Sequence, residues 1–221
     1  MLKSTEKLIA KELKFASGSI GENGQRVVDA YDLYLVENEG GHLVLVIFMK
    51  VQFKFNDHAD QEWFEHEKHA YVQEFEEIIN RVWGNNRVLK ELSENQRVHL
   101  DIRFQSIVDR WSFNENWEVH VTKIAEGKFY QSHLNPITGK VTLDSEDVVP
   151  LERERGISQR GIVHEFGHML GLPDDYAEDS PHFHDVASVM HSGEAVRPRH
   201  DAVFMKWLHR KLEDWQKGKL V

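Results

Sequence analysis

The residues best suited to chemistry in this sequence are His164, Glu165 and His168, which lie close together in one short stretch. On a helix the two histidines are one turn apart, with roughly 6 Å between their Cα atoms, and point to the same side. Two imidazole nitrogens can then converge on one zinc ion at about 2.0–2.1 Å. Glu165 is poorly placed to bind that ion but well placed to hydrogen-bond a water molecule on it. This is the physical content of the HExxH pattern.

A zinc ion with two histidine ligands needs a further protein ligand, and the residues after His168 indicate its source. Gly171 can adopt the left-handed conformation that ends a helix, and Pro173 prevents the helix from continuing. Asp174 is the next side chain able to bind a metal. We therefore predict a single zinc ion held by His164, His168 and Asp174.

Several neighbouring side chains leave alternatives open. Asp175 is more typical of a capping or hydrogen-bonding residue, or of one that faces water, but it is the alternative to Asp174 as a ligand. His182 and His184 lie in a polar loop, where solvated histidines are the usual case and metal binding the lesser alternative. Three more histidines lie among glutamates and are expected on a solvated helix face: His58, His66 and His69.

The stretch from His164 to Asp174 resembles the extended HExxHxxGxx(H/D) pattern of the metzincin clan of zinc peptidases. In that clan the third ligand, usually His and in some members Asp, precedes a tight turn with an invariant methionine beneath the metal. Residues 188–192 (Ser-Val-Met-His-Ser) resemble this Met-turn, so the resemblance places Met190 beneath the zinc site. Two features depart from the clan: Ser192 stands where some members have a tyrosine, and the spacer between Asp174 and Met190 is short.

Hydrophobic periodicity predicts the elements that must position these residues. Alternating apolar residues predict strands, and apolar residues at helical spacing predict amphipathic helices. The predicted strands are 43–55, 98–108 and 119–124, with one or two short strands in 127–149 around a turn at 135–139. The predicted helices are 57–83, 157–170 and 200–216.

This order predicts an α+β fold, and the resemblance makes it a metzincin-like one. We expect a mixed, twisted sheet with the long helix and the HExxH helix packed on the same side, and a C-terminal helix after the Met-turn. No linker divides the chain, so 1–221 are expected to form a single domain. Residues 1–26 are expected to be an N-terminal extension that need not be rigid, with a loop at 17–26.

Composition excludes several classes of function. The 221 residues carry a formal charge of −10, with no cluster of Lys and Arg that could follow a nucleic-acid backbone. The sequence contains no cysteine, which excludes disulfides, thiolate zinc sites and thiol catalysis. Residues 1–15 lack the apolar core of a secretory signal, and the longest apolar run, 43–49, is too short to span a membrane. We therefore expect no membrane insertion, and a cytoplasmic protein or one exported by a non-classical route.

The resemblance implies hydrolysis of peptide bonds in a peptide or protein substrate. A bound zinc ion lowers the pKa of its water to about 7, and Glu165 is expected to act as the general base. The clan also implies a substrate that lies extended along an edge strand, here within residues 119–144.

Other functions are compatible with the same stretch. One is a zinc amidase that acts on cell-wall peptides, and another is a peptidase toxin delivered by a bacterium, which would have an inhibitor or immunity protein as a partner. A third, from a different class, is a non-catalytic binding module stabilised by metal. Glu165 favours an enzyme, because a purely structural zinc site has no use for a base.

Overall fold

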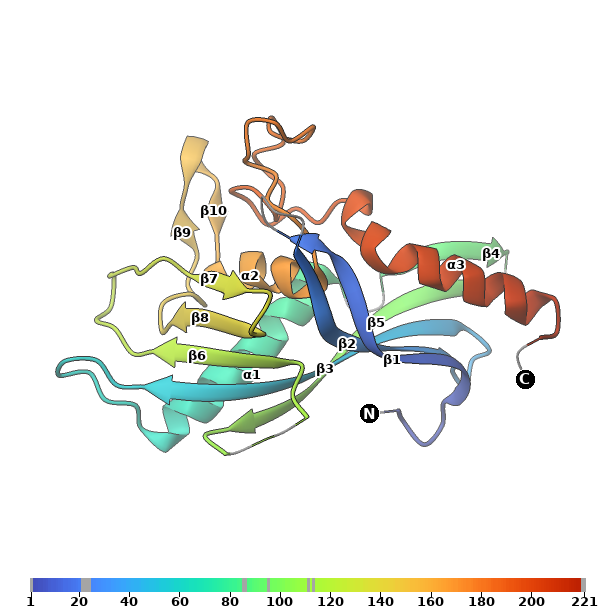
Figure 1. Cartoon of the computed structure of the whole chain (residues 1–221), viewed down its shortest axis with the longest axis horizontal. Coiled ribbons are helices and arrows are strands. Elements are labelled where there is room, and N and C mark those ends of the chain that lie inside the picture. Colours follow the sequence, from blue (N-terminus) through green and yellow to red (C-terminus); the bar gives the residue numbers. More distant parts are fainter. Residues whose placement is uncertain are drawn as a thin grey trace.

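The computed structural model describes residues 2–20, 25–84, 87–94, 96–110, 112 and 114–219. Within these residues the fold is α+β, with three α-helices and a mixed sheet (Figure 1). The strands of the large sheet are β1 (Lys7–Ile20), β2 (Gln25–Glu37), β3 (Leu43–Asn56), β4 (Val88–Ser93), β5 (Gln96–Val108), β6 (Trp117–Thr122), β7 (His133–Asn135) and β8 (Lys140–Asp144). A separate small hairpin consists of β9 (Leu151–Glu152) and β10 (Ser158–Gln159). The α-helices are α1 (Glu65–Trp83), α2 (Gly161–Leu170) and α3 (Ala202–Gln216), and two short 3-10 helices are η1 (Glu154–Gly156) and η2 (Pro198–Asp201).

Strand β3 is the central strand of the large sheet. Its first half pairs antiparallel with β2, which in turn pairs with β1. Its second half pairs in parallel with β6, which continues through β8 to the edge strand β7. Along its other side β3 pairs in parallel with β5, and β5 with β4. The predicted mixed sheet is therefore confirmed, and its central strand is the one predicted at 43–55.

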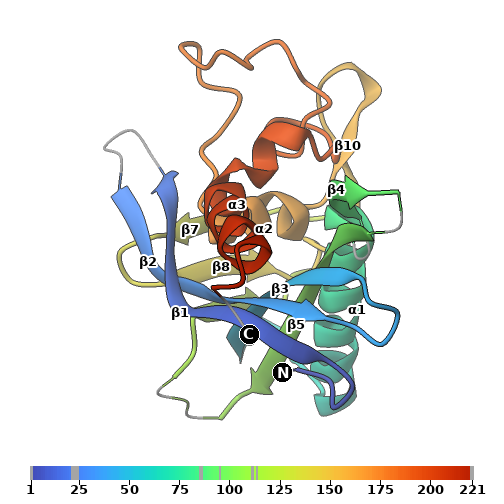
Figure 2. The same ribbon diagram turned by 90° about the vertical axis from the view of Figure 1, so that its right-hand side faces the viewer.

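The three α-helices contribute to one apolar core on a single face of this sheet. The ring of Phe75 on α1 packs against Phe53 of β3 at 5.3 Å between centroids. Phe104 of β5 contacts both Phe75, at 5.8 Å, and Phe166 of α2, at 6.0 Å. One strand residue thus touches both helices, which places α1 and α2 on the same side of the sheet as predicted. Strands β1 and β2 stand beside α3 (Figure 2).

The opposite face of the sheet is covered partly by the N-terminal residues. Val46 and Phe48 of β3 are buried in a small second cluster, against which Leu2 packs. Glu6 and Arg103 form a buried ion pair on the same face, and the Arg103 guanidinium lowers the pKa of the Glu6 carboxyl. The first residues are therefore held by apolar contact and by charge.

The expectation of an N-terminal extension over residues 1–26 is wrong. β1 is a full member of the large sheet, and Ile9 and Ala10 are buried in the main core. Ile9 and Ala10 are adjacent but both buried, next to a register shift in the pairing of β1 with β2.

The loop predicted at 17–26 is also wrong for its described part. Residues 17–20 belong to β1 and residues 25–26 to β2, while 21–24 lie outside the described residues. The serines and glycines of this segment are typical of turns, but pairing between the two strands overrides that local preference.

Helix α1 begins later than the predicted start near residue 57. It starts at Glu65, and the carboxylate of Asp57 accepts a hydrogen bond from the backbone N–H of Trp63 at 2.8 Å. Aspartate side chains often bond to nearby backbone donors in this way and so stabilise non-helical turns. The helix ends where predicted, at Gly84, whose backbone is left-handed.

Helix α2 also begins later than predicted, at Gly161 instead of near residue 157. The preceding residues form β10, which pairs with β9. The buried side-chain amide of Gln159 donates to the carbonyl oxygens of Val189 and Gly193, at 2.9 and 2.7 Å. These long-range hydrogen bonds hold the segment extended.

The remaining predicted elements are present, with ends shifted by a few residues. They correspond to β5, β6, β7, β8 and α3. The sequence pattern missed β1, β2, β4, β9 and β10. Among the described residues, no helix is both long enough and apolar enough to cross a membrane.

Trp83 ties α1 to the helix that carries the HExxH stretch. Its buried indole donates a hydrogen bond to the carbonyl oxygen of Val163 at 3.2 Å, and its ring meets Phe166 edge-on.

We expect Trp83→Phe to lower the free energy of unfolding by about 1–3 kcal/mol through a lost hydrogen bond and a small cavity. Urea unfolding would measure this, with the exposed Leu13→Ala as a control expected to change stability by less than about 0.5 kcal/mol. Equal effects of the two substitutions would contradict this role.

Candidate metal centre

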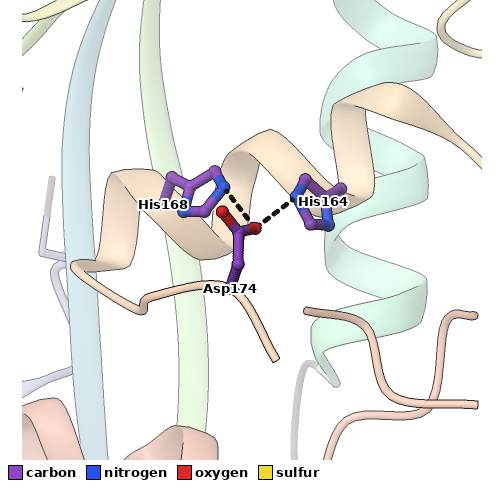
Figure 3. Close-up of side chains that lie close together, drawn as sticks. All are labelled: His164, His168 and Asp174. Atoms are coloured by element: carbon purple, nitrogen blue, oxygen red, sulfur yellow. Dashed lines mark ion pairs between the residues drawn. The ribbon is translucent and has the colours of Figure 1, made fainter. Parts of the chain in front are cut away.

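Helix α2 presents His164 and His168 from the same side, one turn apart (Figure 3). Their rings lie 4.8 Å apart between centroids and nearly perpendicular to each other. The apolar residues of α2, Ile162, Val163, Phe166, Met169 and Leu170, are buried in the main core. Burial of that face fixes the rotation of the helix, and the two imidazoles are left facing the cleft.

Asp174 approaches both histidines from the loop after α2 (Figure 3). Its Oδ1 atom lies 3.1 Å from Nε2 of His164 and 3.2 Å from Nε2 of His168. Neither contact has hydrogen-bond geometry, so Oδ1 is a buried acceptor without a donor in the described structure. Among the described residues, these three side chains form the group of ligand atoms close enough together to hold a metal ion.

The separations within this group fit a tetrahedral zinc ion. Two ligand atoms at about 2.0–2.1 Å from such an ion lie roughly 3.3–3.4 Å from each other. The observed separations of 3.1 and 3.2 Å are close to that value. Two imidazoles and one carboxylate are also a donor set that zinc accepts.

Backbone carbonyls fix the second nitrogen of each imidazole. Nδ1 of His164 lies 3.1 Å from the carbonyl oxygen of Val189, and Nδ1 of His168 lies 2.8 Å from that of Leu172. A carbonyl oxygen only accepts, so each Nδ1 donates and each neutral ring keeps the lone pair on Nε2 for a metal.

The chain turns sharply after α2 to deliver Asp174. Gly171 ends the helix with φ 94° and ψ 26°, a left-handed conformation that favours glycine. The backbone N–H of Leu172 donates to the carbonyl oxygen of Gly167 at 3.0 Å, which closes the turn. The same turn aims the Leu172 carbonyl at His168.

Asp175 lies outside the metal group. Its carboxylate accepts hydrogen bonds from the hydroxyl of Ser188 at 2.6 Å and from the guanidinium of Arg199 at 2.8 Å. Its backbone N–H donates to the carbonyl oxygen of Met190 at 2.8 Å. Burial acts to raise the pKa of Asp175, but Arg199 and Ser188 outweigh it and hold that pKa below its usual range. Asp175 therefore joins the ligand loop to the turn that contains Met190.

Glu165 is buried beside the two histidines. Its side chain is 5% exposed, and its Oε2 atom has no hydrogen-bond partner in the described structure. Burial raises the pKa of its carboxyl, although the neighbouring histidines act in the opposite direction. An unpartnered carboxylate oxygen at the edge of a cleft is available to bond to a water molecule or a substrate.

Met190 lies directly against α2. A Cβ atom built on Gly167 would come within 2.1 Å of the Met190 sulfur, so the close approach requires a glycine there. Met190 is buried, and the preceding residue supplies the carbonyl that holds His164. The turn 188–192 closes through the backbone hydrogen bond from His191 to Ser188 at 3.0 Å.

The other histidines considered from the sequence lie outside the group of ligand atoms. His182 is half-buried and His184 exposed in the loop after Asp174. The histidines before and on α1 are all exposed: His58, His66 and His69. His58 contacts the hydroxyl of Tyr130 at 3.2 Å, and His66 stacks on Phe64.

A cleft of about 860 Å³ opens onto the three ligands and Glu165. Strand β7 at the edge of the sheet contributes His133 and Leu134 to one wall. The turn after Met190 contributes His191 and Ser192 to the other. Such a volume is typical of a site for a small molecule or for part of a peptide chain.

Tyr176 is a cleft residue that sequence reasoning missed. Its ring stacks on His164 at 6.2 Å between centroids, with 20° between the planes. Burial and the charges of Asp174 and Glu165 raise the pKa of its hydroxyl, which therefore stays protonated. The signal in the sequence was an aromatic residue two positions after Asp174, whereas the sequence analysis considered only the position of Ser192.

Comparison with known proteins adds no family to this description. No protein-family model matches the chain, and no curated protein sequence matches it. The chemical interpretation therefore depends on the geometry of the cleft itself.

We expect Asp174→Ala and Asp175→Ala to have different effects. Loss of Asp174 removes a ligand atom, so zinc affinity should fall by at least roughly 100-fold in a competitive metal titration. Loss of Asp175 should leave zinc affinity within about tenfold but lower the free energy of unfolding by about 1–3 kcal/mol, because Ser188 and Arg199 each lose a carboxylate acceptor and Arg199 keeps only Asp185. The reverse order in the titration would make Asp175 the ligand.

The contact between Gly167 and Met190 predicts a coupled pair of substitutions. Gly167→Ala alone should destabilise the protein by about 1–3 kcal/mol, because the new methyl group collides with the Met190 sulfur. In a Met190→Ala background the same change should cost less, because only the contact with the Trp83 ring at 3.2 Å remains and helix propensity favours alanine. Denaturant unfolding of the four proteins gives the coupling energy. An equal cost in both backgrounds would show that the two residues do not compete for space.

Proposed function

We propose that the protein is a zinc-dependent endopeptidase whose ion is held by His164, His168 and Asp174. One observation carries this proposal: three ligand atoms converge in an open cleft, next to a buried carboxylate without a protein donor. Structural zinc sites are usually closed by four protein ligands, whereas catalytic sites keep one position open. Three protein ligands facing a cleft favour the catalytic type.

A bound zinc ion would supply Lewis acidity, acting on both a water molecule and the scissile carbonyl. Glu165 is then the residue that moves the proton. Its free Oε2 can accept a proton from the attacking water and pass it to the nitrogen of the leaving amine.

Tyr176 has the position and chemistry of an oxyanion donor. Its ring lies roughly parallel to that of His164, and the raised pKa keeps the hydroxyl hydrogen available for donation. A hydroxyl in such a place can donate a hydrogen bond to the negative oxygen that develops as the carbonyl is attacked. Tyr176 would then take the place of the tyrosine that some metzincins carry at the position of Ser192.

Strand β7 is the feature that favours an extended peptide as the substrate. It lies at the edge of the large sheet, pairs with β8 on one side, and supplies residues to the cleft wall. A peptide can add to such an edge through backbone hydrogen bonds while its side chains enter neighbouring pockets. β7 lies within 119–144, the region in which the sequence analysis expected the substrate.

The metzincin resemblance remains part of this proposal. It is supported by the Asp174 ligand position and by Met190, which packs against the site helix at Gly167. Cleavage of ordinary peptides would support the endopeptidase, and cleavage of cell-wall peptides alone would support an amidase. Cleavage of neither would favour a metal-stabilised binding module.

Substitution of Glu165 tests the mechanism. We expect Glu165→Gln to keep zinc bound, because the ligands are unchanged, and to reduce peptide hydrolysis by on the order of 10²–10⁴-fold. Metal analysis of the purified variant and digestion of a diverse peptide library provide the two measurements. Wild-type activity in the variant would rule out Glu165 as the base, and loss of zinc would mean that the residue acts on the metal site instead.

A further inference from the structure

An arginine stacked on a phenylalanine forms part of the cleft lining, away from the metal ligands in sequence. The guanidinium carbon of Arg153 lies over the ring of Phe129, 5.0 Å from its centroid. Both residues line the same cleft as Glu165 and the three ligands. Arg153 is half-buried, whereas its neighbour in the hairpin, Arg155, is exposed and is not a lining residue.

Arg153 lies in the β9–β10 hairpin, which is connected to the candidate metal centre by hydrogen bonds. Its backbone N–H donates to the carbonyl oxygen of Ile157 at 2.7 Å, which closes the β9–β10 hairpin. Within β10 the buried Gln159 amide donates to the carbonyl oxygen of Val189, the same oxygen that faces Nδ1 of His164. The position of Arg153 is therefore tied to that of the ligands.

The segment that carries Phe129 is held by hydrogen bonds to two carboxylates. The backbone N–H of Tyr130 donates to the carboxylate of Asp144 at 2.9 Å. The backbone N–H of Gly127 donates to the carboxylate of Glu146 at 3.0 Å. These two hydrogen bonds hold the segment that carries Phe129 against the end of β8, so the stacked pair joins two anchored segments.

Arg153 differs from the other arginines around the cleft in its charge balance. Arg160 pairs with Glu194, and Arg197 and Arg199 both pair with Asp185. No carboxylate pairs with the Arg153 guanidinium among the described side chains, and its contact there is the Phe129 ring.

The carboxylates that line the cleft also leave this charge uncompensated. They are Glu165 and Asp174, and both belong to the metal centre. Among the described lining residues, the part of the cleft at Arg153 therefore carries a positive charge and no carboxylate. A chain with a formal charge of −10 keeps an unpaired cation in the place where a substrate would enter.

We propose that Arg153, stacked on Phe129, is a subsite for a carboxylate of the substrate, and that the protein prefers peptides with Asp or Glu at one fixed distance from the cleaved bond. This inference rests on the proposed peptidase function. Contact with a ring leaves the guanidinium N–H groups free of a protein acceptor among the described residues, and two parallel N–H groups match a carboxylate. The alternative source of the same chemistry is the C-terminal carboxylate of a short peptide.

Digestion of a proteome-derived peptide library by the zinc-loaded protein tests this preference. Sequencing of the products by mass spectrometry should show enrichment of Asp and Glu at one position relative to the cleaved bond. Matched peptides with Glu or Gln at that position, each with a free or an amidated C-terminus, then separate the two sources of carboxylate. A preference that follows the terminal carboxylate and ignores Glu would overturn the side-chain assignment.

The Arg153→Gln variant, with Arg155→Gln as its matched control, tests the residue itself. We expect Arg153→Gln to lower kcat/KM for the Glu peptide roughly 10–100-fold and to leave the Gln peptide unchanged. Arg155→Gln should change neither. An equal loss for both peptides would assign Arg153 a structural role only, and no loss for either would remove it from recognition.

A binding measurement distinguishes failure of this inference from failure of the proposed function. An array of matched Glu and Gln peptides can be probed with the Glu165→Gln protein, with and without Arg153→Gln. Preferential binding of Glu peptides that requires Arg153 would support the subsite even if no peptide is cleaved. Cleavage without any acidic preference in the library or the array would overturn the subsite and leave the peptidase proposal standing.

Discussion

The orientation of two imidazole rings is the constraint on which the candidate metal centre depends. The carbonyl oxygens of Val189 and Leu172 each hold one Nδ1 atom, and this directs both Nε2 atoms toward Asp174. One carbonyl comes from the turn next to Met190 and the other from the loop after Gly171. The helix, the loop and the turn must therefore all be in place before the ligands converge, which makes the centre a product of tertiary structure as well as of sequence spacing.

A close approach at a glycine and a cluster of aromatic rings hold helix α2 in place for that assembly. Gly167 lacks the methyl group that would strike Met190, so the turn can approach the helix closely. On the opposite side of α2, Phe166 packs against Trp83 and Phe104, which connects the helix to α1 and to the sheet. The candidate metal centre is thus supported on one side by a long-range loop contact and on the other by the main core.

The parts of the fold and site that could be predicted depend on short-range patterns. The spacing of His164 and His168 on one helix, followed by Gly171, is a local signal, and the structure brings these histidines and Asp174 together. Alternation identified β3 and β5 because their residues on one face are buried and apolar. The late starts of α1 and α2 could not be predicted, since side-chain hydrogen bonds of Asp57 and Gln159 to the backbone decide them.

The residues that were missed owe their positions to contacts distant in sequence. Arg153 and Phe129 meet only after the β9–β10 hairpin has formed, and neither belongs to a recognisable pattern. Tyr176 is close to Asp174 in sequence, but its stacking on His164 depends on the path of the loop. β1 was missed because its exposed face is charged and its bulges interrupt the alternation.

The N-terminal residues that cover the second face of the large sheet have a practical consequence for the purified protein. Leu2 shields apolar residues of β3, and the Glu6 side chain is only 4% exposed in its pairing with Arg103. An affinity tag or fusion partner joined directly before Leu2 would crowd this packed surface and expose apolar residues of β3. Residues 217–219 after α3 are exposed, so the C-terminal side offers the safer point of attachment.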